Sequence, residues 1–172
     1  MLDPHNPCWS EEFAALHKVY SQALGSLAVC IEHVGSTSVP DLLAKPILDI
    51  DIVISGYDTF PQVVAALKTL GYFHNGDQGI PEREAFKYAD TFTPHVSPPR
   101  TWMTHHLYVC PQHGRELRRH LAFRDALRES TQLRRDYERL KLSIASRSGG
   151  NRSVYAEIKE VECRNFVEGI IN

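Results

Sequence analysis

The sequence predicts an α/β (α+β) fold in which helices flank a mixed sheet and the C-terminal third is helical. Three observations support this prediction. Short β-prone and helical segments alternate over the first two thirds, three longer helical patterns follow Gly114, and Pro or Gly marks most boundaries. With 172 residues, 42% of them hydrophobic, the chain is long enough to build one core. We therefore expect a single domain over residues 1–172.

The first helix is predicted to begin at Ser10, because serine caps helix N-termini and an apolar stripe follows as far as Gly25. This stripe consists of Phe13, Leu16, Tyr20 and Leu24. Residues 27–34 are short, apolar and rich in β-branched side chains, which predicts a strand. The strand runs directly into a Gly35-Ser36 turn, after which we expect a short helix.

A second strand is predicted over residues 47–54, which follow Pro46 and are strongly β-prone. Pro61 suits the first position of a helix, which Gly71 would end. Three further strand-like segments lie around residues 72–73, 85–88 and 104–110. The three C-terminal helices are marked by the apolar stripes Leu117 and Leu121; Leu133, Tyr137, Leu140 and Ile144; and Val154, Ile158, Val161 and Phe166.

Charge is distributed unevenly along the chain. The net charge is −2, yet residues 115–147 hold ten Lys or Arg against five Asp or Glu. This excess could bind an anionic partner such as nucleic acid. The sequence favours a pair of solvated helices instead, because nucleic-acid-binding domains are usually strongly basic as a whole.

Composition also limits which class of protein this is and where in the cell it is expected. The cysteines are far apart and form no CxxC pair, which argues against a zinc cage or a dense disulfide framework. No segment approaches the ~20 apolar residues that span a bilayer, and the N-terminus lacks a basic region followed by an apolar run. We expect a soluble, cytoplasmic protein without a membrane partner. The sequence does not predict an oligomeric state.

Two carboxylates mark the second predicted strand. Asp49 and Asp51 are two residues apart, so their side chains leave the same face, opposite the apolar face of that strand. Like charges so close repel unless a cation or solvent neutralises them. Mg²⁺, held by one or two carboxylates and by substrate phosphates, would do so. The alternative is a polar face that simply meets water.

The turn after the first strand supplies a second element of a candidate site. Gly35 permits close backbone approach and can leave N–H groups pointing outward to an anion. The hydroxyls of Ser36, Thr37 and Ser38 could add donors. Twelve residues separate Ser36 from the Asp49–Asp51 strand, so two neighbouring strands can bring this turn and a metal together. Alone, a Gly-Ser pair usually marks an ordinary turn.

These segments resemble the signature of the GrpB family. The resemblance begins with Glu32-His33-Val34-Gly35-Ser36-Thr37-Ser38-Val39-Pro40 and Lys45-Pro46-Ile47-Leu48-Asp49-Ile50. It continues in order through Gly79-Ile80-Pro81 with Arg83, Thr104-His105-His106-Leu107-Tyr108-Val109, His120-Leu121-Ala122-Phe123-Arg124-Asp125, Tyr137 with Leu140-Lys141, and Tyr155 with Lys159. It covers nearly the whole chain.

The GrpB family is grouped with the polymerase-beta-like nucleotidyltransferases, and this grouping implies a site and a reaction. Gly35 and Ser36 would hold the phosphates of a nucleotide, while Asp49 and Asp51 would bind Mg²⁺. The implied reaction transfers a nucleoside monophosphate from a nucleoside triphosphate to an acceptor hydroxyl. The small-molecule acceptor is not identified by the resemblance, and kinship of fold does not establish activity.

The chain departs from the superfamily pattern at the third carboxylate, which active members usually carry on a later strand. In residues 104–110, His106 leaves the face opposite His105, which makes His106 the candidate for the third position as general base or ligand. A structural role for both histidines is equally expected. Glu84 is a weaker candidate for the carboxylate.

Two further cations could contact the triphosphate. Lys45 lies just before the strand of Asp49 and could touch phosphate. Arg83 follows a Gly-Ile-Pro turn and could contact either the triphosphate or the acceptor, since its guanidinium suits bidentate phosphate binding. Three hypotheses remain open: a Mg²⁺-dependent nucleotidyltransferase, a nucleotide-binding or regulatory module without turnover, and, less expected, an RNA-binding protein that uses the basic helices.

Overall fold

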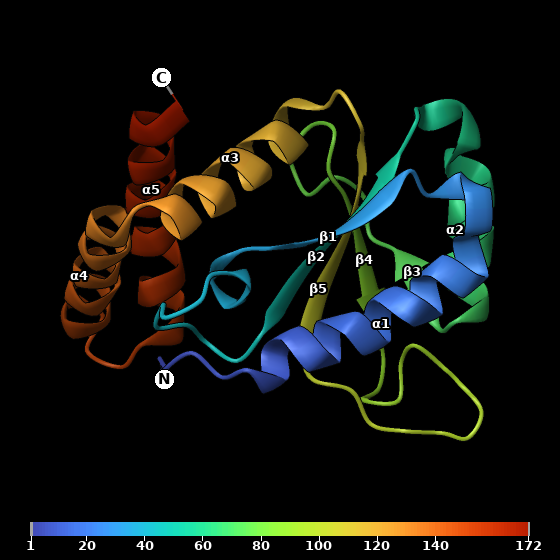
Figure 1. Ribbon diagram of the computed structural model, residues 1–172, viewed down its shortest axis with the longest axis horizontal. Helices are drawn as coiled ribbons and strands as arrows, with labels where there is room; N and C mark the ends of the chain where they lie inside the picture. The colour runs from blue at the N-terminus through green and yellow to red at the C-terminus, as the bar shows by residue number, and fades with distance from the viewer. Residues whose placement is uncertain (1, 172) are drawn as a thin grey trace.

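The computed structural model describes residues 2–171, without the side chains of residues 152, 156, 160 and 171. Its centre is a mixed sheet in which β2 and β5 are parallel while the other neighbouring pairs are antiparallel (Figure 1). The strands lie in the order β1 (Cys30–Val34), β2 (Leu48–Ile54), β5 (His105–Pro111), β4 (Glu84–Tyr88) and β3 (Tyr72–His74). The mixed sheet predicted from the sequence is therefore confirmed.

One face of the sheet is covered by α1 (Cys8–Leu24) and α2 (Phe60–Thr69), which the sequence predicts as amphipathic helices. Alternation places every second residue of β2 on this face, where Leu48, Ile50 and Ile52 are fully buried. They join Leu16 and Tyr20 of α1 in the main hydrophobic core. This core leaves the opposite face of β2 available for polar side chains.

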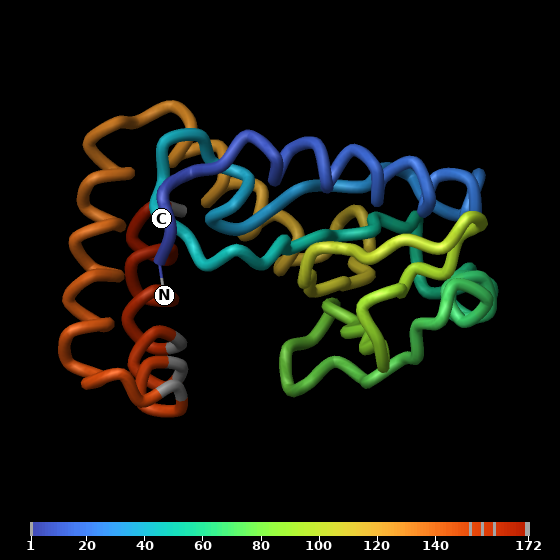
Figure 2. The backbone as a smooth tube through the Cα atoms, turned by 90° about the horizontal axis from the view of Figure 1, so that it is seen from below, coloured from blue at the N-terminus to red at the C-terminus, as the bar shows by residue number. Residues whose placement is uncertain are grey.

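The C-terminal third forms three helices, α3 (Arg115–Glu129), α4 (Thr131–Arg147) and α5 (Arg152–Ile171), which pack on one another at one end of the sheet (Figure 2). Their shared core includes Leu127, Tyr137 and Ile144, together with Val39 and Leu42 from the segment that follows β1. The helical bundle is thus attached to the end of the sheet where β1 turns into β2. The predicted helical C-terminal third is confirmed.

The starts of the first helix and the first strand differ most from the prediction. Helix α1 begins at Cys8, two residues before Ser10, with Pro7 at its N-cap. Strand β1 begins only at Cys30, because Gly25–Leu27 forms a 3-10 turn (η1) after α1. A second such turn, η2 (Ser36–Ser38), follows Gly35, and a third, η3 (Tyr57–Thr59), leads into α2. Among the described residues, no helix is long and apolar enough to cross a membrane.

Candidate functional site

Asp49 and Asp51 lie on the face of β2 opposite α1 and α2. Asp51 is completely buried, whereas about a third of the Asp49 side chain, 33%, remains exposed. The parallel register with β5 places His106 beside Asp49 and Tyr108 beside Asp51. Neighbouring strands therefore present two rows of polar side chains on one face, as strand periodicity predicts.

His106 contacts Asp49 directly. Its Nδ1 lies 2.9 Å from Asp49 Oδ1, and in this hydrogen bond the ring nitrogen donates to the carboxylate. The opposite nitrogen, Nε2, is then free to accept a proton, and half of the side chain, 52%, is exposed. By contrast, His105 is buried on the other face, where it bonds the Tyr72 hydroxyl and Met103 O. His105 is therefore the histidine with a structural role.

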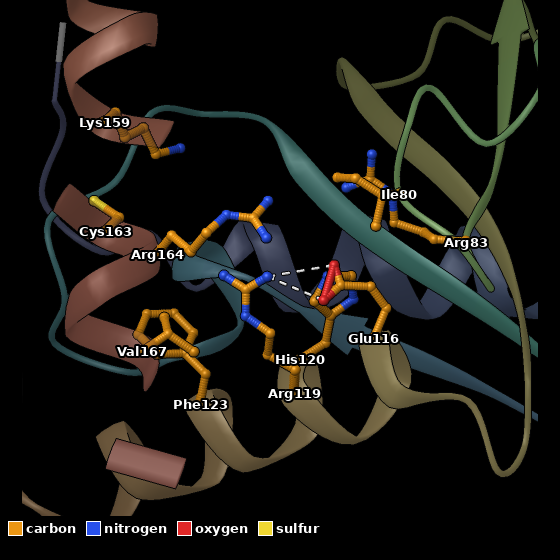
Figure 3. A pocket seen from close by; sticks show the side chains of 10 residues that line it. All are labelled: Ile80, Arg83, Glu116, Arg119, His120, Phe123, Lys159, Cys163, Arg164 and Val167. Carbon is orange, nitrogen blue, oxygen red and sulfur yellow. Dashed lines mark hydrogen bonds and ion pairs between the residues drawn. The ribbon is translucent and has the colours of Figure 1, made fainter. Parts of the chain in front are cut away.

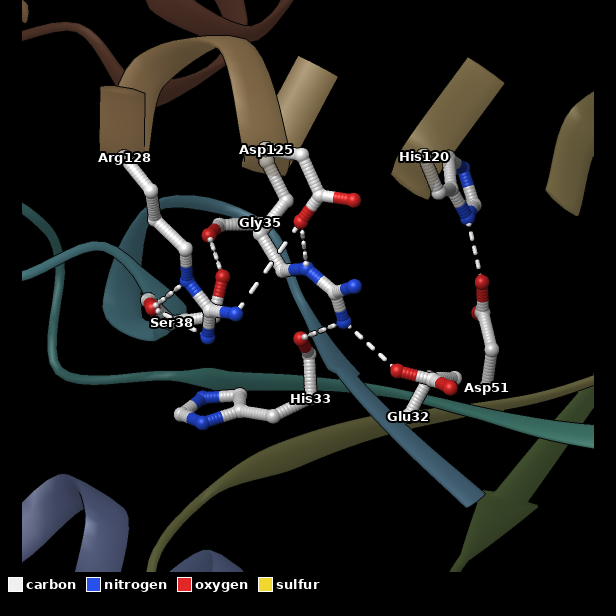
Figure 4. Close-up of polar contacts among 9 residues, drawn as sticks. Glu32, His33, Gly35, Ser38, Asp51, His120, Asp125 and Arg128 are labelled. Atoms are coloured by element: carbon white, nitrogen blue, oxygen red, sulfur yellow. Dashed lines mark hydrogen bonds and ion pairs between the residues drawn. The ribbon is translucent and has the colours of Figure 1, made fainter. Parts of the chain in front are cut away.

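His120, to which the sequence assigns no role, pairs with Asp51. Its Nδ1 donates to Asp51 Oδ2 over 2.6 Å from α3 (Figure 4). Burial lowers the pKa of His120, but the adjacent negative charge and hydrogen bond of Asp51 outweigh burial and raise that pKa above its ordinary value. The second oxygen, Asp51 Oδ1, is buried and has no hydrogen-bond partner in the described part of the chain. Such an oxygen is a candidate ligand atom.

Gly35 brings the turn into close contact with Asp49. Its φ of 71° and ψ of −172° fall in a region that essentially only glycine occupies. A Cβ at this position would lie 2.3 Å from Asp49 Oδ2. The absence of a side chain therefore lets the carboxylate of β2 rest against the backbone at the end of β1.

The three hydroxyls after Gly35 have different environments. Ser36 is partly exposed and lies 3.5 Å from Lys141 Nζ. Thr37 and Ser38 are buried, and their hydroxyls donate to Ile47 O and Gly35 O. In this structure the hydroxyls of Thr37 and Ser38, expected to face a phosphate, bond the backbone of the turn and of the segment before β2, whereas Ser36 lines the cavity with Asp49.

Lys141 of α4 is a second residue that sequence reasoning missed. It is 2% exposed and donates to Leu43 O and Ser36 Oγ. Burial lowers the pKa of Lys141 to about 8, since a buried ammonium is poorly solvated. Lys141 lines the same cavity as Asp49 and His106, which has a volume of about 210 Å³. The polar residues of its lining are Ser36, Lys45, Asp49, His106, Lys141, Tyr155 and Lys159.

Lys45 lies in this cavity, as expected for a phosphate contact, with its Nζ 4.0 Å from the centre of the Tyr155 ring. Arg83 does not. Its guanidinium carbon lies 4.5 Å from the centre of the Tyr108 ring, and its side chain lines a separate pocket beyond His120. The structure therefore separates Arg83 from the other residues expected to bind phosphate. Glu84 bonds His74 and Tyr57, away from Asp49 and Asp51.

Helix α3 secures the turn through two arginines (Figure 4). Arg124 Nη1 donates to Glu32 Oε2 over 2.6 Å and to His33 O over 3.2 Å. One turn further, Arg128 donates from Nε and Nη2 to Ser38 O. The expectation of fully solvated basic helices therefore fails for this side of α3, which faces the sheet.

The donor set fits a Mg²⁺ ion shared with a substrate. No group of three His, Cys, Asp or Glu side chains that could enclose a metal occurs among the residues described. The two carboxylates of β2 remain, and no described residue gives Asp51 Oδ1 a hydrogen-bond partner. Mg²⁺ usually keeps several waters and is bound through one or two carboxylates plus substrate phosphates. The residues thus fit a metal that arrives with a nucleotide.

Comparison with known proteins identifies the family. The family described as GrpB protein matches residues 1–170. UPF0157 protein YqkA of Bacillus subtilis (strain 168) is 29% identical over 91% of this chain, and UPF0157 protein PA4798 of Pseudomonas aeruginosa is 36% identical over 91%. The chain spans only 43% and 62% of the lengths of these two relatives.

Two solved structures share the fold. The conserved protein GrpB from Enterococcus faecalis superposes with a TM-score of 0.74 at 27% identity, covering 100% of both chains. The structure of Cid1 in complex with the UTP analog UMPNPP gives a TM-score of 0.55 at 13% identity, covering 90% of this chain and 48% of that one. The Cid1 likeness shows that this chain has a nucleotidyltransferase-like fold.

Proposed function

This chain belongs to the GrpB family, and we propose that it is a Mg²⁺-dependent nucleotidyltransferase, moving a nucleoside monophosphate from a nucleoside triphosphate to an acceptor hydroxyl. One observation carries the proposal. Asp49 and Asp51 share a face of β2; within the described part of the chain the buried Asp51 Oδ1 has no hydrogen-bond partner, and the Gly35-Ser36 turn lies directly against Asp49. The nucleotide in the Cid1 structure supports a triphosphate as the ligand.

The cations of the cavity suit the triphosphate. Lys141, Lys45 and Lys159 line the same space as Ser36 and Asp49. Ammonium groups beside a phosphate chain form charge-assisted hydrogen bonds, and Ser36 can add a neutral one. In this proposal these side chains orient the triphosphate, while Asp49 and Asp51 hold Mg²⁺. The ion, when bound, would neutralise negative charge on the phosphates.

His106 is proposed as the general base. Asp49 accepts a hydrogen bond from Nδ1–H of the imidazole, so Nε2 is the ring nitrogen that can accept a proton. The acceptor hydroxyl would lose its proton to Nε2 as its oxygen attacks the α-phosphorus, and pyrophosphate would leave. This role accounts for a histidine at the position where other members of the superfamily carry a third carboxylate. A cytoplasmic location, where nucleoside triphosphates are available, belongs to the same proposal.

A second candidate is a nucleotide-binding module without turnover. The observation that favours it is the missing third carboxylate near Asp49 and Asp51 in the described residues. Binding would then serve regulation, and His106 would only orient Asp49.

Incubation with labelled nucleoside triphosphates, Mg²⁺ and a panel of hydroxyl-bearing small molecules separates the two candidates. The nucleotidyltransferase predicts pyrophosphate release that depends on the acceptor, and His106→Ala should slow release by a factor of about 10²–10⁴. His113→Ala, an exposed histidine outside the cavity, is the matched control. Tight nucleotide binding without pyrophosphate release across the panel would favour the binding module.

A further inference from the structure

A second pocket, of about 310 Å³, lies beside the carboxylate site and, apart from Lys159, takes no part in the proposal above. It is enclosed by the segment before β4, by α3 and by α5 (Figure 3). We call it the arginine pocket; its lining comprises Ile80, Arg83, Glu116, Arg119, His120, Phe123, Lys159, Cys163, Arg164 and Val167.

Charge in this pocket is predominantly positive. Three arginines and Lys159 line it against one carboxylate, that of Glu116, which accepts from Arg119 over 3.0 Å. Glu168, which does not line the pocket, forms an ion pair with Arg119. In Figure 3, Arg119 and Arg164 direct their guanidinium groups into the same space as Glu116, and Arg83 approaches from the other side. Cations so close repel one another, and an anion between them removes that cost.

Among the described residues, two guanidinium N–H groups in the pocket have no hydrogen-bond acceptor. Arg83 Nε and Arg119 Nε are buried and have no hydrogen-bond partner in the part of the chain that is described. Glu168 approaches Arg119 Nε only to 3.7 Å, beyond hydrogen-bond distance. Arg83 is held in place by its stacking over Tyr108. Buried donors without acceptors are costly, and guanidinium forks match the oxygens of phosphate.

The arginine pocket adjoins the candidate active site at two residues. His120 lines the pocket and donates to Asp51. Lys159 lines both the pocket and the cavity of Asp49 and His106. A small molecule anchored in the pocket would therefore extend toward the carboxylates, and Ile80, Phe123 and Val167 provide apolar surface for its body.

From this arrangement we propose that the arginine pocket binds the phosphate group of a small phosphorylated molecule and presents a hydroxyl of that molecule to the carboxylate site. The occupant is thus the acceptor. Its designation as acceptor rests on the proposed function, whereas the binding of a phosphate in this pocket does not.

Calorimetric titration of the full chain with inorganic phosphate and glycerol 3-phosphate, without nucleotide or Mg²⁺, tests the binding. Glycerol is the uncharged counterpart and should not bind. Arg83→Met and Arg164→Met should each weaken glycerol 3-phosphate binding about tenfold or more, since charge-assisted hydrogen bonds to phosphate are lost. Arg139→Met, an exposed arginine of α4 outside the pocket, should bind like the wild type.

The variant Lys141→Met tests in which cavity the phosphate binds, because Lys141 lines the cavity of Asp49 and His106 and not the arginine pocket. If this variant rather than Arg83→Met loses binding, the proposal is overturned, as it is by unchanged binding in both arginine variants. Should Arg83→Met fail to fold, Arg83→Lys keeps the charge but removes the planar fork and should still weaken binding. If a 5′-phosphorylated RNA oligomer binds more tightly than glycerol 3-phosphate and its binding depends on Arg83 in the same way, the occupant of the pocket is nucleic acid and not a small molecule.

The double variant Asp49→Asn with Asp51→Asn separates this proposal from the proposed function. It should bind inorganic phosphate like the wild type, because neither carboxylate lines the arginine pocket. If no nucleoside triphosphate binds the wild type while glycerol 3-phosphate binds through Arg83, the proposed transfer reaction and the designation as acceptor both fail, and the phosphate-binding pocket stands.

Discussion

Gly35 supports the site because it has no side chain. Its positive φ and its contact with Asp49 Oδ2 leave no room for a side chain. Asp49 can therefore lie against the turn and still bond His106 through Oδ1. Substitution at this position tests whether the contact between turn and carboxylate contributes to stability.

Gly35→Ala should destabilise the protein more than Gly25→Ala. Both glycines have positive φ, but a Cβ at Gly25 would meet no atom within 4 Å. Backbone strain of about 1–3 kcal/mol is common to both variants. We expect Gly35→Ala to lose about 1–3 kcal/mol more, because Asp49 must move. Urea unfolding measures both losses, and equal losses would show that the contact with Asp49 is not tight.

His120 should make the stability of the protein depend on pH. Its pKa is raised in the folded state above its ordinary value of 6.5, because the charge and hydrogen bond of Asp51 outweigh burial. The stabilisation is therefore complete below about pH 6.5 and is lost as pH rises through the raised pKa. His120→Gln, which keeps a hydrogen-bond donor without the charge, should cost about 1–2 kcal/mol at pH 6 and less at pH 9.

Urea unfolding at the two pH values measures this difference, with His113→Gln as the exposed control. A loss from His120→Gln that is the same at pH 6 and pH 9 would mean that His120 acts only as a neutral hydrogen-bond donor to Asp51.

Lys141 should make nucleotide binding depend on pH as well. Burial lowers its pKa to about 8, so the ammonium loses its charge as pH rises through that value. If Lys141 contacts the triphosphate, affinity should fall from pH 7 to pH 9. Lys141→Arg stays charged over this range and should not show the fall. Calorimetric titrations at pH 7 and pH 9 measure the affinity of each protein for the triphosphate. The same pH dependence in the wild type and in Lys141→Arg would exclude Lys141 from the phosphate site.

At the scale of elements, α3 joins the helical bundle to the sheet through a stripe of polar residues. Glu116, His120, Arg124 and Arg128 recur every fourth residue, which places them on one side of a helix. Three of them contact, in order, Asp51, Glu32 and Ser38 O. The stripe therefore fixes the first two strands and the turn relative to the bundle.

Arg124→Met should weaken this connection. It leaves the Glu32 carboxylate without its guanidinium partner and removes a donor to His33 O. Since Arg124 is only 12% exposed, we expect a loss of about 1.5–3 kcal/mol. Arg118→Met, on the exposed side of the same helix, should change stability by less than about 0.5 kcal/mol. Similar urea midpoints for the two variants would show that the contacts of Arg124 add nothing.

At the scale of the whole molecule, local sequence patterns predicted the elements better than the site. Periodicity placed the strands, the helices and the shared face of Asp49 and Asp51, because these depend on neighbouring residues. The partner of Asp51 could not be found in this way, since His120 is 69 residues distant in sequence. The four-residue spacing along α3 is the signal that would have indicated a polar side facing the sheet.

Tertiary packing also determines how the residues expected to bind phosphate are arranged. Thr37 and Ser38 were expected to serve a ligand, yet their hydroxyls are buried by the segment that follows them. Arg83, expected at the triphosphate or the acceptor, lies over Tyr108 and lines the arginine pocket rather than the cavity of Asp49. Sequence identifies residue types suited to phosphate, whereas tertiary packing decides which of them share a cavity.

Isothermal titration of nucleoside triphosphates, with and without Mg²⁺, into the wild type and the double variant Asp49→Asn with Asp51→Asn tests the central claim most directly. We predict Mg²⁺-dependent binding to the wild type and binding at least about tenfold weaker in the double variant. The control, Asp41→Asn with Asp58→Asn, changes two exposed carboxylates and should bind normally. Equal Mg²⁺-dependent binding by the double variant, or no binding by the wild type, would contradict the account.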